Sequence, residues 1–160
     1  IQIFDRSGQT VSEMRAKTRK LIHQFEGKKP IIFIDYLTLV KPTHNYNGNM
    51  HQQVTEISND LKEMAKEFNC HVVSLAQLSR AVEQRSEKKP IMADIRESGS
   101  IEQIADVIMF LYREKYYNKD SDDNTMEIIV GKNRNGPIGS AKPLYNEFTG
   151  ELKDDSQGFV

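Results

Sequence analysis

The sequence has a single cysteine, Cys70, which excludes an internal disulfide and a cysteine-rich metal site. Because Cys70 stands before an apolar run, we expect a buried, unreactive thiol. No segment reaches the roughly 20 apolar residues needed to span a membrane, and no signal peptide opens the chain. These absences predict a protein without membrane attachment and with a cytoplasmic location.

An excess of charge of one sign is also missing. Lysine and arginine number 22 and aspartate and glutamate 23, which gives a net charge of -1. A protein without a global positive field has to bind nucleic acid through a local patch. The histidines show no metal-ligand spacing, and we assign no metal cluster to them: His23, His44, His51 and His71.

A phosphate-binding loop of the form G-x-x-x-x-G-K-S/T is absent from these 160 residues. The first residue, Ile1, is not a start methionine, and residues 1–5 form a β-like run, so we interpret the start as a truncation. Residue 36, directly after an apolar run that ends in Asp35, is tyrosine rather than glutamate. The phosphate loop and the general base of an ATPase are therefore expected upstream.

Apolar patterning alternates between strand and helix periods, which predicts an α/β fold. Two unbroken apolar runs, 31–35 and 72–76, are typical of a mostly parallel sheet that helices cover on both faces. We predict a single domain over residues 1–160, with a charged, flexible segment at 114–124. Further expected elements are helices from Thr10 to Gly27, over 54–68 and from about Ser100, strands at 1–5, 107–112 and 126–130, and antiparallel strands within 140–152.

Each of the two apolar runs ends at a polar residue that suits phosphate chemistry. Ligands of open α/β sheets bind beyond the carboxyl ends of the strands, where Asp35 and Gln77 stand. A carboxylate there suits the magnesium ion of a bound nucleotide, and an amide can sense a terminal phosphate. From these residues alone, Asp35 as a turn cap and Gln77 as a loop residue bonded to backbone stay open alternatives.

Residues 94–100 combine a cation, carboxylates, hydroxyls and a glycine ahead of an expected helix. Glycine lets a phosphodiester approach closely, and N–H groups at a helix start attract phosphate. The segment, with Arg96, Glu97 and Gly99, is suited to binding the phosphodiester backbone of a nucleic acid without contacts to the bases. A solvated loop that ends in a helix cap is the alternative.

Lys132 and Arg134 follow the predicted strand at 126–130 and precede a Gly136-Pro137 turn. Two cations on a rigid hairpin are able to reach a triphosphate held by another subunit, as an arginine finger does. Two ordinary surface cations are the alternative.

Four segments together resemble successive motifs of the DnaB family of bacterial and phage replicative helicases. They are Ile-Ile-Phe-Ile-Asp-Tyr-Leu at 31–37, Leu-Ala-Gln-Leu-Ser-Arg at 75–80, Asp-Ile-Arg-Glu-Ser-Gly-Ser-Ile-Glu-Gln at 94–103 and Gly-Lys-Asn-Arg-Asn-Gly-Pro-Ile-Gly at 131–139. The resemblance runs from about Ile3 to Phe148, and the last two segments are highly specific as a pair.

The resemblance implies a RecA-like ATPase core in a hexamer that translocates on single-stranded DNA and unwinds duplex. It implies ATP and Mg²⁺ as ligands, and a helicase loader and primase as partners. By resemblance, the site residues are Asp35 (magnesium ligand), Gln77 (γ-phosphate sensor), Lys132 and Arg134 (reaching the neighbouring subunit's ATP), and Arg96, Glu97 and Gly99 (DNA contacts). The piece alone is expected to lack ATPase activity, and a non-catalytic DNA- or partner-binding module is the alternative function.

The chain differs from the family's usual sequence at four positions, and no direct role is assigned to these positions. Ile104 replaces a frequent aspartate, Thr38 a frequent glutamine, Ala76 a serine and Asn133 a glutamine. Because Ile104 removes a carboxylate close to the predicted DNA loop, the hydrogen bonding of that loop is put in doubt.

Overall fold

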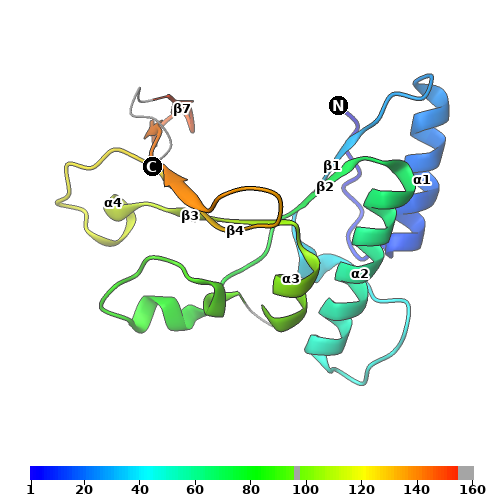
Figure 1. Ribbon diagram of the computed structural model, residues 1–160, viewed down its shortest axis with the longest axis horizontal. Helices are drawn as coiled ribbons and strands as arrows, with labels where there is room; N and C mark the ends of the chain where they lie inside the picture. The colour runs from blue at the N-terminus through cyan, green and yellow to red at the C-terminus, as the bar shows by residue number, and fades with distance from the viewer. Residues whose placement is uncertain (96–97, 155–160) are drawn as a thin grey trace. The chain divides into compact units, whose positions relative to one another are not determined.

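The computed structural model describes residues 1–95 and 98–154, and it consists of two compact units. Unit 1 comprises Ile1–Gln77 and Arg96–Ala105, and unit 2 comprises Leu78–Ile95 and Asp106–Val160. Helices and strands alternate along the chain, which confirms the α/β class (Figure 1). The prediction of a single domain over residues 1–160 stays a prediction. No helix in the described part of the chain is long and apolar enough to cross a membrane.

Helix α1 (Val11–Gln24) begins after Thr10, the predicted start, and a capping box of Thr10 and Glu13 closes its first turn. The Thr10 hydroxyl accepts the N–H of Glu13 at 3.3 Å, and the Glu13 carboxylate accepts the N–H of Thr10 at 2.8 Å. At the other end, Gly27 has a φ of 78° and donates its N–H to the Ile22 carbonyl at 2.8 Å. The predicted start of this helix is confirmed, whereas the helix ends at Gln24, and Gly27, with the positive φ at which glycine is favoured, lies in the turn that follows.

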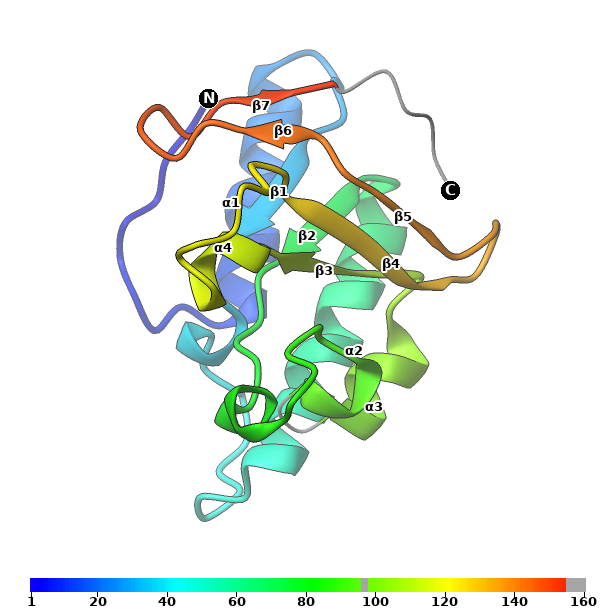
Figure 2. The same ribbon diagram turned by 90° about the vertical axis from the view of Figure 1, so that its left-hand side faces the viewer.

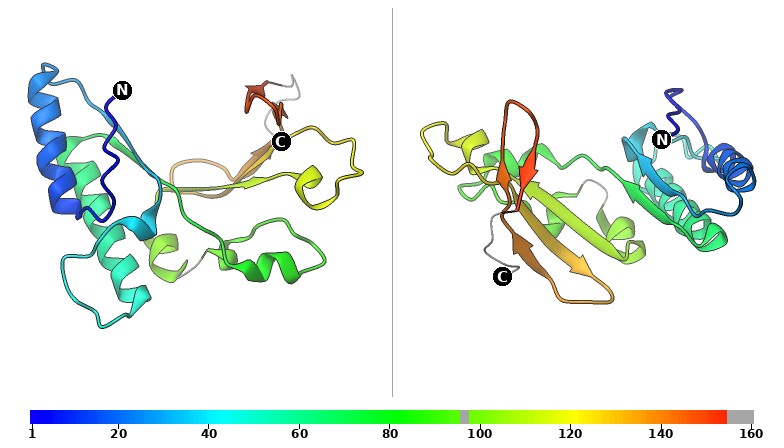
Figure 3. Two further views of the ribbon diagram at one scale, coloured as in Figure 1. Left: turned by 180° about the vertical axis from the view of Figure 1, so that it is seen from behind. Right: turned by 90° about the horizontal axis from the view of Figure 1, so that it is seen from above.

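Unit 1 is built on a parallel pair of strands, β1 (Ile31–Ile34) and β2 (His71–Ser74), as the apolar runs predict. Helices α1 and α2 (Met50–Phe68) lie on one side of this pair (Figures 1 and 3). A 3-10 turn, η1 (Leu37–Leu39), follows β1, and helix α3 (Ser98–Ile104) packs on α2. The core joins both helices to the strands through Val11, Ile34, Leu37, Val40, Val54, Ile57, Leu61 and Met64.

Burial on both faces, predicted for these strands, is not observed in the described residues. Ile34 is buried, but its neighbours Ile31 and Phe33 are 60 % and 74 % exposed. Side chains alternate between the faces of a strand, and the two helices cover only one face. The strand predicted at residues 1–5 is also not observed, because no described strand pairs with that segment.

Unit 2 contains an antiparallel sheet of β3 (Val107–Tyr112), β4 (Glu127–Asn133) and β5 (Gly139–Ala141), shown in Figure 2. A second antiparallel pair joins β6 (Leu144–Tyr145) to β7 (Leu152–Lys153). The predicted antiparallel strands near the end of the chain are confirmed, and antiparallel pairing begins already at β3. Two 3-10 turns, η2 (Arg80–Gln84) and η3 (Met92–Asp94), lie in the segment that precedes α3 in the sequence.

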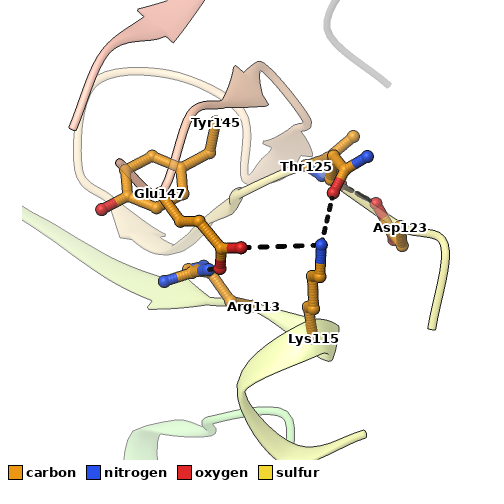
Figure 4. A pocket seen from close by; sticks show the side chains of 7 residues that line it. Arg113, Lys115, Asp123, Thr125, Tyr145 and Glu147 are labelled. Atoms are coloured by element: carbon orange, nitrogen blue, oxygen red, sulfur yellow. Dashed lines mark hydrogen bonds and ion pairs between the residues drawn. The ribbon is translucent and has the colours of Figure 1, made fainter. Parts of the chain in front are cut away.

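The segment at 114–124, predicted to be flexible, starts with a short helix, α4 (Glu114–Tyr117), and its flexibility stays a prediction. Figure 4 shows how a polar cluster holds it: Glu147 pairs with Arg113 at 3.1 Å and with Lys115 at 3.7 Å. Lys115 also donates to the Asn124 side chain at 3.0 Å. Lys115 is thus used in an ion pair within unit 2, whereas Lys119, Asp120 and Asp122 are exposed.

Candidate functional site

Asp35 and Gln77 follow neighbouring parallel strands and therefore lie at the same edge of the β1–β2 pair, here called the rim. Backbone pairing continues past the strands, because Leu75 donates to the Ile34 carbonyl and accepts from the Leu37 N–H, both at 2.9 Å. These two bonds bracket Asp35, whose peptide bond to the next residue is cis. Asp35 and Gln77 are both exposed. The structure thus brings the two predicted nucleotide residues to one rim.

The rim is held by packing on either side of Asp35. Ile34 and Leu37 are 8 % and 5 % exposed and belong to the core, so the backbone that carries Asp35 is fixed. No group of three or more histidine, cysteine, aspartate or glutamate side chains converges in the described residues. A magnesium ion commonly takes one or two carboxylates together with phosphate oxygens, and a single exposed aspartate fits that requirement.

The predicted DNA residues Arg96 and Glu97 lie outside the described residues. Gly99 is exposed and lies within the first turn of α3 rather than ahead of the helix, because the helix already begins at Ser98. A Cβ atom at Gly99 would lie 3.9 Å from the His51 Nε2 of α2. Ser100 is only 8 % exposed, and its hydroxyl has no hydrogen-bond partner among the residues described, so this hydroxyl does not face solvent.

Asp94, the first residue of the predicted DNA segment, is used inside unit 2. It is 4 % exposed and receives two hydrogen bonds from Arg85, at 3.1 and 2.8 Å. The same carboxylate accepts the N–H of Ile91 at 2.8 Å. A bidentate pair of this kind holds the loop between η2 and η3 closed. The Asp94 carboxylate is therefore a structural group and not a nucleic-acid contact.

Lys132 and Arg134 lie at the end of β4, where the sheet is irregular. The register shifts between Ile108 and Met109 of β3, and Gly131 is the extra residue on β4. A Cβ atom at Gly131 would lie 2.7 Å from the ring of Phe110, so only glycine fits. A bulge redirects the side chains that follow it, and here the residues that follow are Lys132 and the hairpin turn.

The hairpin turn after β4 is closed by side chains. Asn133 donates from Nδ2 to the Pro137 carbonyl at 3.1 Å and accepts the N–H of Asn135 at 3.3 Å. Arg134, half-exposed, donates from Nη1 to the Asp106 carboxylate at 3.3 Å. The turn therefore presents Arg134 from a fixed backbone.

Sequence reasoning missed three residues of this hairpin: Gly131, Asn133 and Asp106. A glycine inside a strand is a signal for a bulge or a close backbone approach, but the predicted strand ended at residue 130, so Gly131 was not assigned to it. Asp106 directly precedes the predicted strand at 107–112, but only the antiparallel register shows that it lies opposite Arg134. Asn133 carried no signal, since an asparagine near a turn has many uses.

Comparison with known proteins shows which family the chain matches. The family model of the DnaB-like helicase C terminal domain matches residues 1–154. The chain is 47 % identical to the replicative DNA helicase DnaC of Bacillus subtilis (strain 168), covering 99 % of the chain and 36 % of that protein. It is 49 % identical to the replicative DNA helicase DnaB of Geobacillus stearothermophilus, covering 92 % of the chain and 33 % of the relative. The chain thus spans about a third of the length of these curated relatives.

Solved structures agree with the sequence relatives. A DnaB-like replicative helicase, described together with its interactions with primase, matches with a TM-score of 0.91 and 44 % identity over 96 % of this chain and 37 % of that one. A second solved structure, described as an ATPase domain, matches with the same TM-score of 0.91 and 44 % identity, over 96 % of this chain and 54 % of that domain.

Proposed function

The chain belongs to the family of DnaB-like helicase C-terminal domains, and from this we propose that it forms part of the motor of a replicative DNA helicase. The proposed motor is an ATP-dependent hexamer that moves along single-stranded DNA and unwinds duplex. Residues outside this chain supply the phosphate loop and the general base. Primase and a helicase loader are its proposed protein partners, the former supported by the relative described with primase.

At the rim of unit 1, Asp35 would hold the magnesium ion of bound ATP, and that ion would neutralise charge on the phosphates. The exposed amide of Gln77, on the neighbouring strand end, would contact the γ-phosphate and report whether it is present. Asp35 stands on backbone that the core of unit 1 fixes, which limits its reorganisation when nucleotide binds.

Lys132 and Arg134 would act on the ATP of an adjacent subunit, where two cations stabilise charge that develops on the transferred phosphoryl group. Arg96, Glu97 and Gly99 would grip the phosphodiester backbone of single-stranded DNA. Contacts to phosphates rather than bases suit a motor that ignores sequence.

One observation carries the proposal: Asp35 and Gln77 lie exposed at the same rim of a parallel pair, in a chain with replicative helicases among its relatives. For the chain by itself, the alternative of a non-catalytic binding module holds, because no G-x-x-x-x-G-K-S/T loop is present to wrap the phosphates. The chain alone therefore serves as a negative control in the test of the proposal.

The test is the Asp35→Asn variant of the full-length protein, assayed for steady-state ATP hydrolysis with single-stranded DNA. Loss of the carboxylate is expected to lower kcat at least about a hundredfold, because a metal contact contributes several kcal/mol. Asp120→Asn, in an exposed loop, is the matched control and should keep native turnover. Native turnover by an assembled Asp35→Asn protein, or turnover above background by the 160-residue chain alone, would contradict the proposal.

A further inference from the structure

The antiparallel register of β3 and β4 brings Asp106 opposite Arg134. Val107 pairs with Asn133 at the end of the ladder, and the next residue on each side continues the pairing. The N–H of Arg134 donates to the Asp106 carbonyl at 2.8 Å. The main chain of Arg134 is thus attached to the start of β3 as well as to its own hairpin.

The backbone at Arg134 has little freedom left. The bonds from the Asn133 side chain to Pro137 and Asn135 close the turn on the other side. Gly136 lies so close to Asn133 that a Cβ atom there would come within 2.7 Å of Nδ2. With the main chain held at both ends, the side-chain torsions of Arg134 decide where its guanidinium lies.

An ion pair restricts those torsions. Arg134 Nη1 lies 3.3 Å from Asp106 Oδ1, and the two side chains are 48 % and 47 % exposed. Opposite charges directly across antiparallel strands attract one another, but exposure to solvent keeps the attraction weak. A pair of this kind changes an equilibrium by about two- to fivefold. Asp106 therefore biases the position of the guanidinium and does not lock it.

We propose that Asp106 is a positioning residue that holds the Arg134 guanidinium while no γ-phosphate is within reach and gives it up to the phosphate of the adjacent subunit. The inference rests on the proposed function of Arg134 as the residue that reaches that phosphate. Asp106 touches neither the nucleotide nor the reacting atoms. It acts only by setting how much of Arg134 is available.

The exchange of partners follows from charge and geometry. A triphosphate carries several negative charges and offers paired oxygens that match the fork of a guanidinium, whereas the Asp106 carboxylate, 3.3 Å from Nη1, carries one charge. Because the pair is half-exposed, Arg134 can leave Asp106 without burying an uncompensated carboxylate. After the γ-phosphate has gone, the same carboxylate is the acceptor to which Arg134 returns.

The test compares Asp106→Asn with the native full-length protein, because asparagine keeps the shape and the backbone carbonyl but removes the charge. ATP binding then no longer competes with the ion pair. The Kd of a non-hydrolysable ATP analogue and the KM for ATP are expected to fall about two- to fivefold, with little change in kcat. The difference should shrink as ionic strength rises from low salt to about 0.5 M, because exposed charges are screened.

Three further variants separate positioning from a structural role. In an Arg134→Ala background, Asp106→Asn should leave analogue affinity unchanged, since the residue through which it acts is gone. Asp106→Glu keeps the charge and should keep affinity closer to native than Asp106→Asn does. If Asp106→Asn fails to assemble, Asp106→Ser gives the same measurement, with thermal unfolding as the check on folding.

The outcomes distinguish the inference from the function on which it rests. Arg134→Ala is expected to lower kcat by about a thousandfold or more. If it leaves kcat at the native value, the proposed role of Arg134 fails. If Arg134→Ala abolishes turnover while Asp106→Asn leaves Kd and KM unchanged or raises them, only the role of Asp106 is overturned. An affinity change that persists without Arg134 would overturn it as well.

Discussion

The two units differ in the kinds of residue that they bury. Unit 1 has an apolar core, in which Met64 is fully buried and Val11 is 2 % exposed. Unit 2 buries apolar residues such as Phe110, but it also buries the carboxylates of Asp94 and Glu127, which are 4 % and 9 % exposed. Each of these carboxylates has a cation at 2.8 Å, supplied by Arg85 or Lys89.

The difference matters for how functional side chains are positioned. Apolar packing has no direction, so the core of unit 1 fixes the backbone on which Asp35 stands rather than the direction of its side chain. Ion pairs and hydrogen bonds do have direction, and in unit 2 they orient side chains, as Asp106 orients Arg134. Unit 2 should therefore respond to changes in charge as well as to changes in volume.

The largest expected effect comes from a change in volume, and it shows how far unit 2 depends on packing besides charge: the same substitution, glycine to alanine, is made in both units. At Gly131 in unit 2, the added Cβ would lie 2.7 Å and 3.3 Å from carbons of the Phe110 ring. The ring or the strand has to move, and overpacking of this kind costs about 1–3 kcal/mol. At Gly99 in unit 1, the nearest atom outside the helix is 3.9 Å away. Gly99→Ala is therefore expected to be neutral or to stabilise by up to about 1 kcal/mol.

Urea unfolding of both variants measures the two effects. A native midpoint for Gly131→Ala would mean that β4 does not need its bulge in order to pass Phe110. That result would show that charge alone, without tight packing, holds the sheet of unit 2.

Glu56 is a largely buried carboxylate in unit 1, and a substitution there tests whether charge also matters in that unit. Its carboxylate, with 11 % of the side chain exposed, accepts the N–H of Thr43 at 2.6 Å and contacts His44 Nδ1 at 3.1 Å. Burial raises the pKa of Glu56, but hydrogen bonds from Tyr46, Thr43 and His44 together outweigh burial and lower the pKa to about 2. Glu56 thereby fastens the loop ahead of α2, the helix whose His51 faces Gly99.

The sign of the pH dependence follows from this lowered pKa. The ionised form is favoured in the folded chain, so its contribution is complete above the ordinary value of 4.5 and is lost as the pH falls towards 2. Glu56→Gln should lower the free energy of unfolding by about 1–2 kcal/mol at pH 7. The difference in this free energy between variant and native chain should become smaller between about pH 5 and pH 3. Urea unfolding of both proteins across that pH range measures this difference. A difference in free energy of unfolding that does not depend on pH would rule out the charge of Glu56 as its cause.

Much of the fold of unit 1 could be predicted from sequence because local signals specify it. The capping box at Thr10 and the apolar period of α2 each act within a few residues. The exposure of Phe33 could not be predicted, since an unbroken apolar run does not say how many helices cover the strand. In unit 2, the charged run at 114–124 has the composition of a solvated loop, and its partner Glu147 lies far along the chain.

The candidate site likewise has one part that the sequence could predict and another that it could not. Asp35 and Gln77 were found because parallel strands place their ends at one rim, a rule that needs only the strand assignment. Asp106 was missed because its relation to Arg134 depends on the register of two antiparallel strands across a bulge. Where a contact depends on register, a shift by one residue changes every partner, and sequence patterning alone does not fix that register at Gly131.

The smallest expected effect concerns the exposed ion pairs of unit 2. Glu147 pairs with Arg113 and Lys115, and these side chains are 41 %, 25 % and 33 % exposed. Glu147→Gln should cost only about 0.5–1 kcal/mol in low salt and less in about 1 M salt, where exposed charges are screened beyond about 3 Å. Glu151→Gln, which loses a single longer pair with Lys153 at 3.5 Å, is the control and should change less. A salt-independent loss above about 2 kcal/mol at Glu147 would exceed what an exposed pair contributes. It would mean that packing around the Arg113 side chain, rather than its charge, holds this part of unit 2, and the contrast between the units would fail there.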